Sequence, residues 1–278
     1  LEFRRVLFRS RAVTEGKPRK WRQLATLIVF LPSVSFWSSA IGKDSISFMA
    51  TGVALWASLD FSHRSRPMIF AVFAMFLVRP HIAGFMVLAL VFAAVLQSNA
   101  SIFKKVFFFV ASLGAVGAMI PFALQYAGLS DISISGAKDY VEDREIQNME
   151  GGGAIDISSM SLPLKIVAYL FRPFPFEASS IPQLAASADN MILMFMVLVG
   201  VFNMIKQRSL RRVELNYFAL IYSILTLLVL AMSTANLGIA VRQKWMFVPM
   251  LLCFLMSVIG TSSKRSSQTQ LQSLKNSG

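Results

Sequence analysis

Charged residues are scarce in this chain, since Asp, Glu, Lys and Arg supply only 15% of its 278 residues. An ordinary soluble domain has about a quarter. Hydrophobic residues reach 55%, and the charges fall in short stretches between long apolar runs. The composition excludes a typical soluble domain and indicates an integral membrane protein.

Cysteine and histidine are almost absent, with one Cys and two His in the whole chain. Cys253 lies inside an apolar run, so no disulfide framework can form. No group of His, Cys, Asp and Glu has the spacing of a metal site, and we expect neither metal nor cofactor.

The chain also lacks an initiating Met, and residues 1–10 resemble a translated sequencing adapter. We leave them out of fold reasoning and expect the natural protein to continue upstream.

Apolar segments recur along the rest of the chain. They cover about 24–41, 46–59, 68–78, 82–96, 106–127, 187–205, 215–235 and 245–260. Backbone groups in a bilayer must be satisfied within the segment, and the alternation of a membrane barrel is absent, so each segment is predicted to be a helix. Pro32, Pro121 and Pro249 predict irregularities. The expected fold is an all-α polytopic bundle of about eight transmembrane segments.

The distribution of Lys and Arg predicts the orientation. One alternating set of connections holds 16 basic and three acidic residues, and the other holds eight basic and ten acidic. By the positive-inside rule the first set is cytoplasmic, and so are both ends of the chain. The predicted order is a basic cytoplasmic segment (11–23), a five-helix block (24–127), an extracytoplasmic loop (128–186), a three-helix block (187–260) and a cytoplasmic tail (261–278). The charge of +13 is thereby assigned to topology, and no nucleic-acid partner is expected.

Five cations fall on the outward side of this plan. They are Lys43, Arg79, Arg172, Arg242 and Lys244. Guanidinium groups match phosphate oxygens with a planar fork of donors, so we expect a diphosphate ligand at this face. Such a clamp would also stabilise charge on a diphosphate leaving group.

An acceptor hydroxyl would need a general base, for which Glu177, Asp44 and His81 are the nearby candidates. Structural readings stand beside these roles. Lys43 and Asp44 would pair at a turn, with Asp44 or Ser45 capping the next helix. Arg79 and His81 would anchor the chain at the interface. Arg242 and Lys244 precede an expected helix, where the macrodipole disfavours cations, so a structural role suits them less.

Three segments carry a family resemblance: residues 31–44 (LPSVSFWSSAIGKD), Arg79-Pro80-His81 and Phe171-Arg172-Pro173-Phe174. They resemble bacterial polymerases of O-antigen and capsular polysaccharide repeat units. The resemblance implies a multi-pass protein of the bacterial inner membrane that joins oligosaccharides carried on polyprenyl diphosphate in the periplasm. Membrane lipid and other polysaccharide-assembly membrane proteins are the further partners it implies, and it implies that periplasmic arginines handle the substrate. Arg172, which lies between aromatics and prolines, is our first candidate for a functional residue.

Two other classes stay open. A membrane glycosyltransferase using a polyprenyl-phosphate sugar would need an acidic residue in its first outer loop. A transporter or flippase for lipid-linked sugars would need an ionisable residue in mid-membrane. None of the eight predicted segments has one near its centre.

Overall fold

The computed structural model describes residues 31–39, 42–97, 160–206 and 216–258, together with scattered positions between 101 and 117. Every regular element in this part of the chain is a helix, which confirms the all-α prediction. The helices are α3 (Pro32–Ser39), α4 (Lys43–Ser58), α5 (Ser65–Val78), α6 (Pro80–Gln97), α9 (Leu162–Phe171), η1 (Pro175–Glu177), α10 (Ile181–Lys206), α11 (Tyr217–Ser233), α12 (Leu237–Gln243), η3 (Lys244–Met246) and α13 (Val248–Val258).

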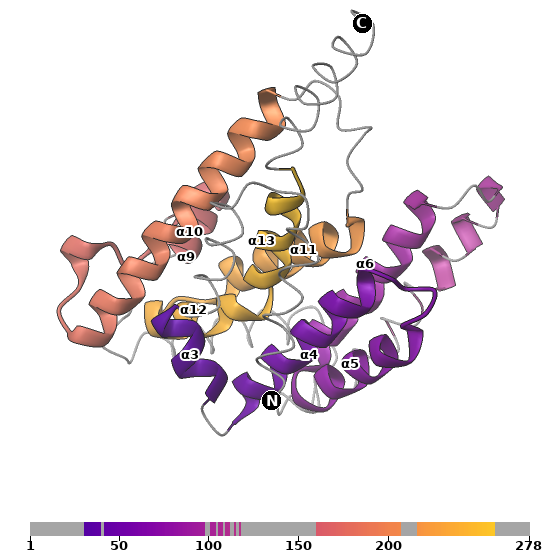
Figure 1. The fold of residues 1–278 in the computed structure, drawn as a ribbon, viewed down its shortest axis with the longest axis horizontal. Coiled ribbons are helices and arrows are strands. Elements are labelled where there is room, and N and C mark those ends of the chain that lie inside the picture. The colour runs from indigo at the N-terminus through magenta and orange to yellow at the C-terminus, as the bar shows by residue number, and fades with distance from the viewer. Residues whose placement is uncertain are drawn as a thin grey trace, which may run out of the picture.

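The helices form one packed bundle. In Figure 1, α4, α5 and α6 lie on one side, α10 lies on the other, and α11 and α13 lie between them. α9 packs against α10 and α11, so the part of the predicted outer loop from 160 to 177 is joined to the bundle. The same loop carries an acidic, glycine-rich stretch, residues 139–153, which lies outside the described residues.

Two helices are long and apolar enough to cross a membrane, namely α6 with 18 residues and α10 with 26. The pair of α12–η3 and α13, bent by 56°, would make a third. α5 and α11 have 14 and 17 residues, below the roughly 20 that span a bilayer. The described helices therefore support a membrane protein with two or three candidate spans, and they do not establish the eight that we predicted.

Small residues bring α4 and α5 close together. Ala50, Ala54 and Ala57 recur every three or four residues on α4 and are fully buried. Ala71 of α5 is equally buried. Without a hydrophobic driving force between helices in lipid, small side chains that let backbones approach are the usual means of association.

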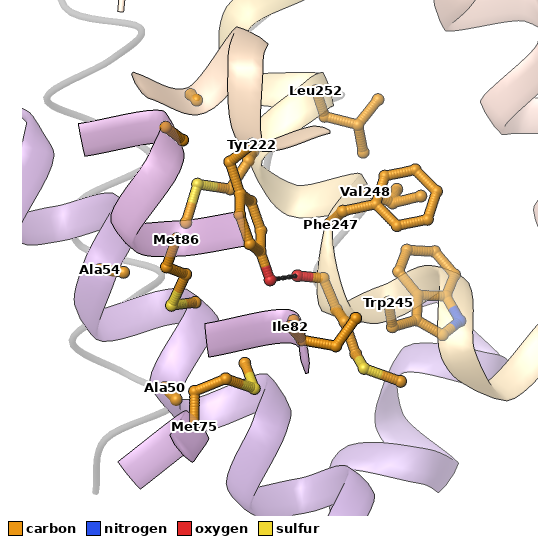
Figure 2. Packing of buried hydrophobic residues seen from close by; sticks show 14 of the residues in the cluster. Ala50, Ala54, Met75, Ile82, Met86, Tyr222, Trp245, Phe247, Val248 and Leu252 are labelled. Atoms are coloured by element: carbon orange, nitrogen blue, oxygen red, sulfur yellow. Dashed lines mark hydrogen bonds between the residues drawn. The ribbon is translucent and has the colours of Figure 1, made fainter. Parts of the chain in front are cut away.

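The break between η3 and α13 lies just before Pro249, as that proline predicted. Proline has no N–H to donate to the carbonyl four residues before it. The Met250 N–H, which would reach Met246 in a continuous helix, donates to the Phe247 carbonyl at 2.9 Å. The carbonyl of Met246 instead accepts a hydrogen bond from Thr51 Oγ1 at 2.7 Å. It also accepts one from Tyr222 Oη at 3.2 Å (Figure 2). Both donors are fully buried, so the bend is held by the bundle core.

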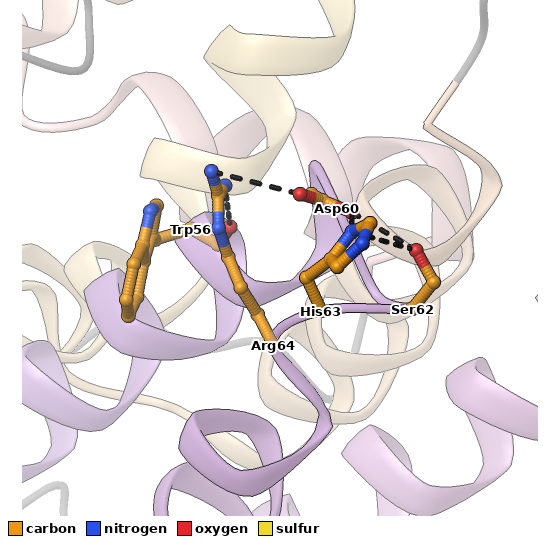
Figure 3. A network of polar contacts seen from close by, with 5 residues as sticks. All are labelled: Trp56, Asp60, Ser62, His63 and Arg64. Atoms are coloured by element: carbon orange, nitrogen blue, oxygen red, sulfur yellow. Dashed lines mark hydrogen bonds and ion pairs between the residues drawn. The ribbon is translucent and has the colours of Figure 1, made fainter.

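The polar connections of α4 and α5 lie at opposite ends of this helix pair. At one end Asp60 contacts His63 and Arg64, and the Arg64 guanidinium lies 4.9 Å from the centre of the Trp56 ring (Figure 3). At the other end, Asp44 opens α4 and Arg79 follows α5. The two sets of connections that the charge pattern separated are thus also separated in space.

Candidate functional site

Asp44 brings two arginines together. Its carboxylate contacts Arg79 Nη2 at 2.6 Å and Arg242 Nε at 3.1 Å, one guanidinium on each oxygen. The Asp44 and Arg79 side chains are 19% and 15% exposed, and Arg242 is 37% exposed. Three residues that are far apart in the sequence therefore form one partly buried cluster, which we call the Asp44 cluster.

Helix ends explain this arrangement. Asp44 lies in the first turn of α4, where the macrodipole favours an anion. Arg79 stands between α5 and Pro80, the first residue of α6, and its backbone N–H donates to the Met75 carbonyl. Arg242 lies in the last turn of α12, where the dipole favours a cation. As the sequence predicted, Arg242 precedes helical elements, η3 and α13, but it also lies inside α12, a helix that we did not predict.

In the Asp44 cluster, one carboxylate lies between two guanidinium groups. Arg79 Nε is buried and has no hydrogen-bond partner. The Arg79 charge also acts on Tyr169, whose hydroxyl is likewise buried without a partner. Buried donors usually have acceptors, so these two groups are exceptions among the described residues.

Lys43 and His81 lie next to the cluster in sequence. Lys43 is the exposed first residue of α4, and His81 is exposed in the first turn of α6. The capping predicted for Asp44 or Ser45 does not form. Gly42 is the N-cap of α4 without a side-chain cap, and Ser45 Oγ donates to the Gly42 carbonyl at 2.8 Å.

Arg172 and Glu177 form a second group, after α9. The guanidinium contacts the carboxylate twice, with Nε to Oε2 at 3.1 Å and Nη2 to Oε1 at 2.9 Å. The backbone N–H of Phe174 also donates to Oε2 at 2.9 Å. Burial raises the pKa of Glu177, but the bonds from Arg172 and Phe174 outweigh it, and the net pKa is lowered. Glu177 is therefore better suited to holding Arg172 than to accepting a proton.

Lys244 is placed differently from the outward position that we predicted. Its side chain is 1% exposed, and Nζ donates to the Leu170 carbonyl at 3.1 Å and to Asn190 Oδ1 at 2.5 Å. The last carbonyls of α9 lack helical partners, and a lysine ammonium satisfies one of them. Lys244 is therefore buried inside the bundle against α9, and it is not at the surface where we predicted it.

Asp189 and Asn190 were missed as site residues. Both are 2% exposed in α10, where Asp189 Oδ2 accepts the Ser33 backbone N–H at 2.7 Å. Asp189 Oδ1 is buried without a hydrogen-bond partner, and its charge acts on Lys244. An acid and an amide adjacent inside an apolar helix were a readable signal. Asp189 lies only two residues inside the predicted segment 187–205, so its charge was assigned to the outer connection; α10 in fact begins at Ile181.

Among the described residues, no group of three or more His, Cys, Asp and Glu could hold a metal ion. The arrangement consists instead of guanidinium groups, carboxylates and buried donors. Comparison with family models, with curated proteins and with solved structures finds no match to this chain.

Proposed function

We propose that this protein joins polyprenyl-diphosphate-linked oligosaccharide repeat units at the periplasmic face of the bacterial inner membrane. The observation that carries the proposal is the Asp44 cluster, in which Arg79 and Arg242 converge at one end of the bundle. The charge pattern assigns this end to the outside. Lipid carriers in the membrane would present their diphosphate at this depth.

In the proposed reaction, an acceptor hydroxyl attacks the anomeric carbon of the donor sugar. The bond from that carbon to the diphosphate oxygen breaks, and its electron pair leaves with the diphosphate. Arg79 and Arg242 stabilise the charge that develops there, aided by Lys43 at the surface. Asp44 keeps the two guanidinium groups in place through its contacts with Arg79 and Arg242.

The hydroxyl proton needs an acceptor. Of the three candidate bases, Asp44 and Glu177 are engaged by arginines, whereas His81 is exposed and lies outside both ion pairs. We assign proton transfer to His81, with Arg172 as the second phosphate or sugar contact, held by Glu177.

The test is polymer formation by the purified full-length chain in proteoliposomes, supplied with lipid-linked oligosaccharide extracted from the native membrane. Arg79→Gln should lower the transfer rate by about 10²-fold, as loss of one donor to a developing anion commonly does. Arg242→Gln should lower it less, because Arg242 is more exposed. Arg64→Gln, at the opposite end of the bundle, is the matched control and should leave the rate unchanged. Transfer at the wild-type rate by both cluster variants would contradict the proposal.

A lipid-linked sugar transporter is the second candidate, and the buried Asp189 in α10 favours it. Coupled transporters use ionisable residues inside the membrane, and Asp189 with Lys244 supplies such a pair. The same proteoliposomes discriminate the two. Movement of lipid-linked sugar across the bilayer without chain extension, abolished by Asp189→Asn, would support transport over polymerisation.

A further inference from the structure

The segment that carries Arg172 is bound on both sides by buried side chains of other helices. The carbonyl of Leu170, two residues before Arg172, accepts a hydrogen bond from Lys244 Nζ at 3.1 Å. The carbonyl of Pro173, the residue after Arg172, accepts a hydrogen bond from Asn190 Nδ2 at 3.2 Å. The two carbonyls that flank Arg172 therefore both accept hydrogen bonds from side chains outside α9.

These two side chains are also bonded to each other. Lys244 Nζ donates to Asn190 Oδ1 at 2.5 Å, so Lys244 and Asn190 form a continuous bridge between the two carbonyls. Both residues are almost fully buried, at 1% and 2% exposure. A buried amino group and a buried amide that bond to each other and to these carbonyls favour a single arrangement, because any displacement leaves a polar group unpaired.

The bridge is anchored in the bundle. Asn190 belongs to α10, which is a candidate span, and Lys244 begins η3 at the bend before α13. Asp189, beside Asn190, supplies negative charge to Lys244 and accepts the Ser33 backbone N–H, which ties α3 to the same place. Such helices move less than an exposed loop, so they can fix the loop's position.

We propose that Lys244 and Asn190 are positioning residues that hold Arg172 and its partner Glu177 where the lipid-linked substrate arrives. Neither residue touches substrate; both act through the backbone of residues 170–173. The expected effect of these two residues on glycosyl transfer rests on the proposed function. Their role in fixing residues 170–173 does not depend on it.

The primary test is backbone hydrogen exchange in the full-length protein in detergent, read over residues 171–180. Lys244→Met and Asn190→Leu should each raise exchange there by about tenfold or more, because the segment would open locally. Lys165→Met on α9 and Asn203→Leu on α10 are matched controls and should leave this exchange unchanged. Asn203 bonds only its own helix, at the Val199 carbonyl.

Asn190→Asp is a more conservative change that keeps the test decisive if Lys244→Met or Asn190→Leu fails to fold. Asn190→Asp keeps an oxygen for Lys244 but loses the N–H donors to the Pro173 carbonyl, so exchange should rise only after residue 172. Unchanged exchange of residues 171–180 in Asn190→Asp and in the folded member of the other two variants would overturn the positioning role.

The second readout is the transfer reaction. The positioning variants should lower kcat more than they raise KM for the lipid-linked donor, and Lys244→Arg should recover part of the rate. Wild-type kcat in variants whose exchange has risen would overturn the link to substrate. Normal transfer by Arg172→Gln would instead count against the role of Arg172 in the proposed function, while the exchange result would still decide whether the bridge holds the segment.

Discussion

Replacing Asp44 by Asn removes the one negative charge that joins Arg79 to Arg242 and leaves two guanidinium groups facing a neutral amide. Breaking a fully buried pair costs about 3–5 kcal/mol, and an exposed pair about 0–1 kcal/mol. The three side chains are 15–37% exposed, so solvent screens part of the interaction. We expect a loss of about 2 kcal/mol, between these two limits.

Thermal unfolding of the purified full-length chain in detergent measures this loss. About 2 kcal/mol should lower Tm by roughly 3–4 °C in a chain of 278 residues. Asp60→Asn makes the same chemical change in the exposed network at the far end of α4, and it should shift Tm little.

A double-mutant cycle then separates the ion pair from other effects of the substitution. Asp44→Asn with Arg79→Gln should destabilise the protein by less than the sum of the single changes, since the second substitution removes the unpaired cation. A coupling energy below about 0.5 kcal/mol would be the additivity expected of independent sites and would refute the cluster.

Three further outcomes follow from the packing and the loop. Gly200→Val should destabilise the α10–α13 contact by about 1–3 kcal/mol through overpacking, because a Cβ at Gly200 would lie 2.5 Å from Leu255 Cδ2. Adding Leu255→Ala to this variant should restore part of the lost stability. A Tm equal to that of the wild type would refute the prediction. Thr51→Val and Tyr222→Phe should each cost about 1 kcal/mol alone but more than their sum together, because only the double variant leaves the Met246 carbonyl unsatisfied; strict additivity in unfolding would contradict the shared acceptor. Glu177 has a lowered pKa in the folded protein, so its pair with Arg172 should contribute stability fully above the ordinary value of 4.5, and that contribution should be lost as pH falls through the lower folded value. Exchange of residues 171–180, followed from about pH 7 to pH 3 with the intrinsic pH dependence of exchange corrected, should show this step in the wild type and not in Glu177→Gln.

The helical class could be predicted because apolar runs in a bilayer leave the backbone few alternatives. Helix ends were harder to place. The sequence predicted a helix over 245–260 and so placed Arg242 before it. In the structure, the bend at residue 247 separates α12 and η3 from α13. Pro249 predicts a bend, but it does not say where the helix before the bend begins.

The sequence predicted that several site residues lie at one end of the helices, but it did not predict their contacts. Charge pattern placed Asp44, Arg79 and Arg242 at one end, but their convergence depends on the packing of α4, α5 and α12. Lys244 was misplaced for the same reason, since its partner Leu170 is 74 residues away and only tertiary structure brings them together. Asp189 was missed because a segment boundary drawn from hydropathy excluded the helical turns before it.

The central claim is that the Asp44 cluster holds the diphosphate of a lipid carrier. Its most direct test is the affinity of the purified full-length chain, in lipid nanodiscs, for a polyprenyl diphosphate without sugar. Charge-assisted hydrogen bonds contribute about 1.5–3 kcal/mol each, so Arg79→Gln and Arg242→Gln should each weaken binding by roughly tenfold to a hundredfold, while Arg64→Gln should bind as the wild type does. Equal affinity in all four proteins would contradict the claim.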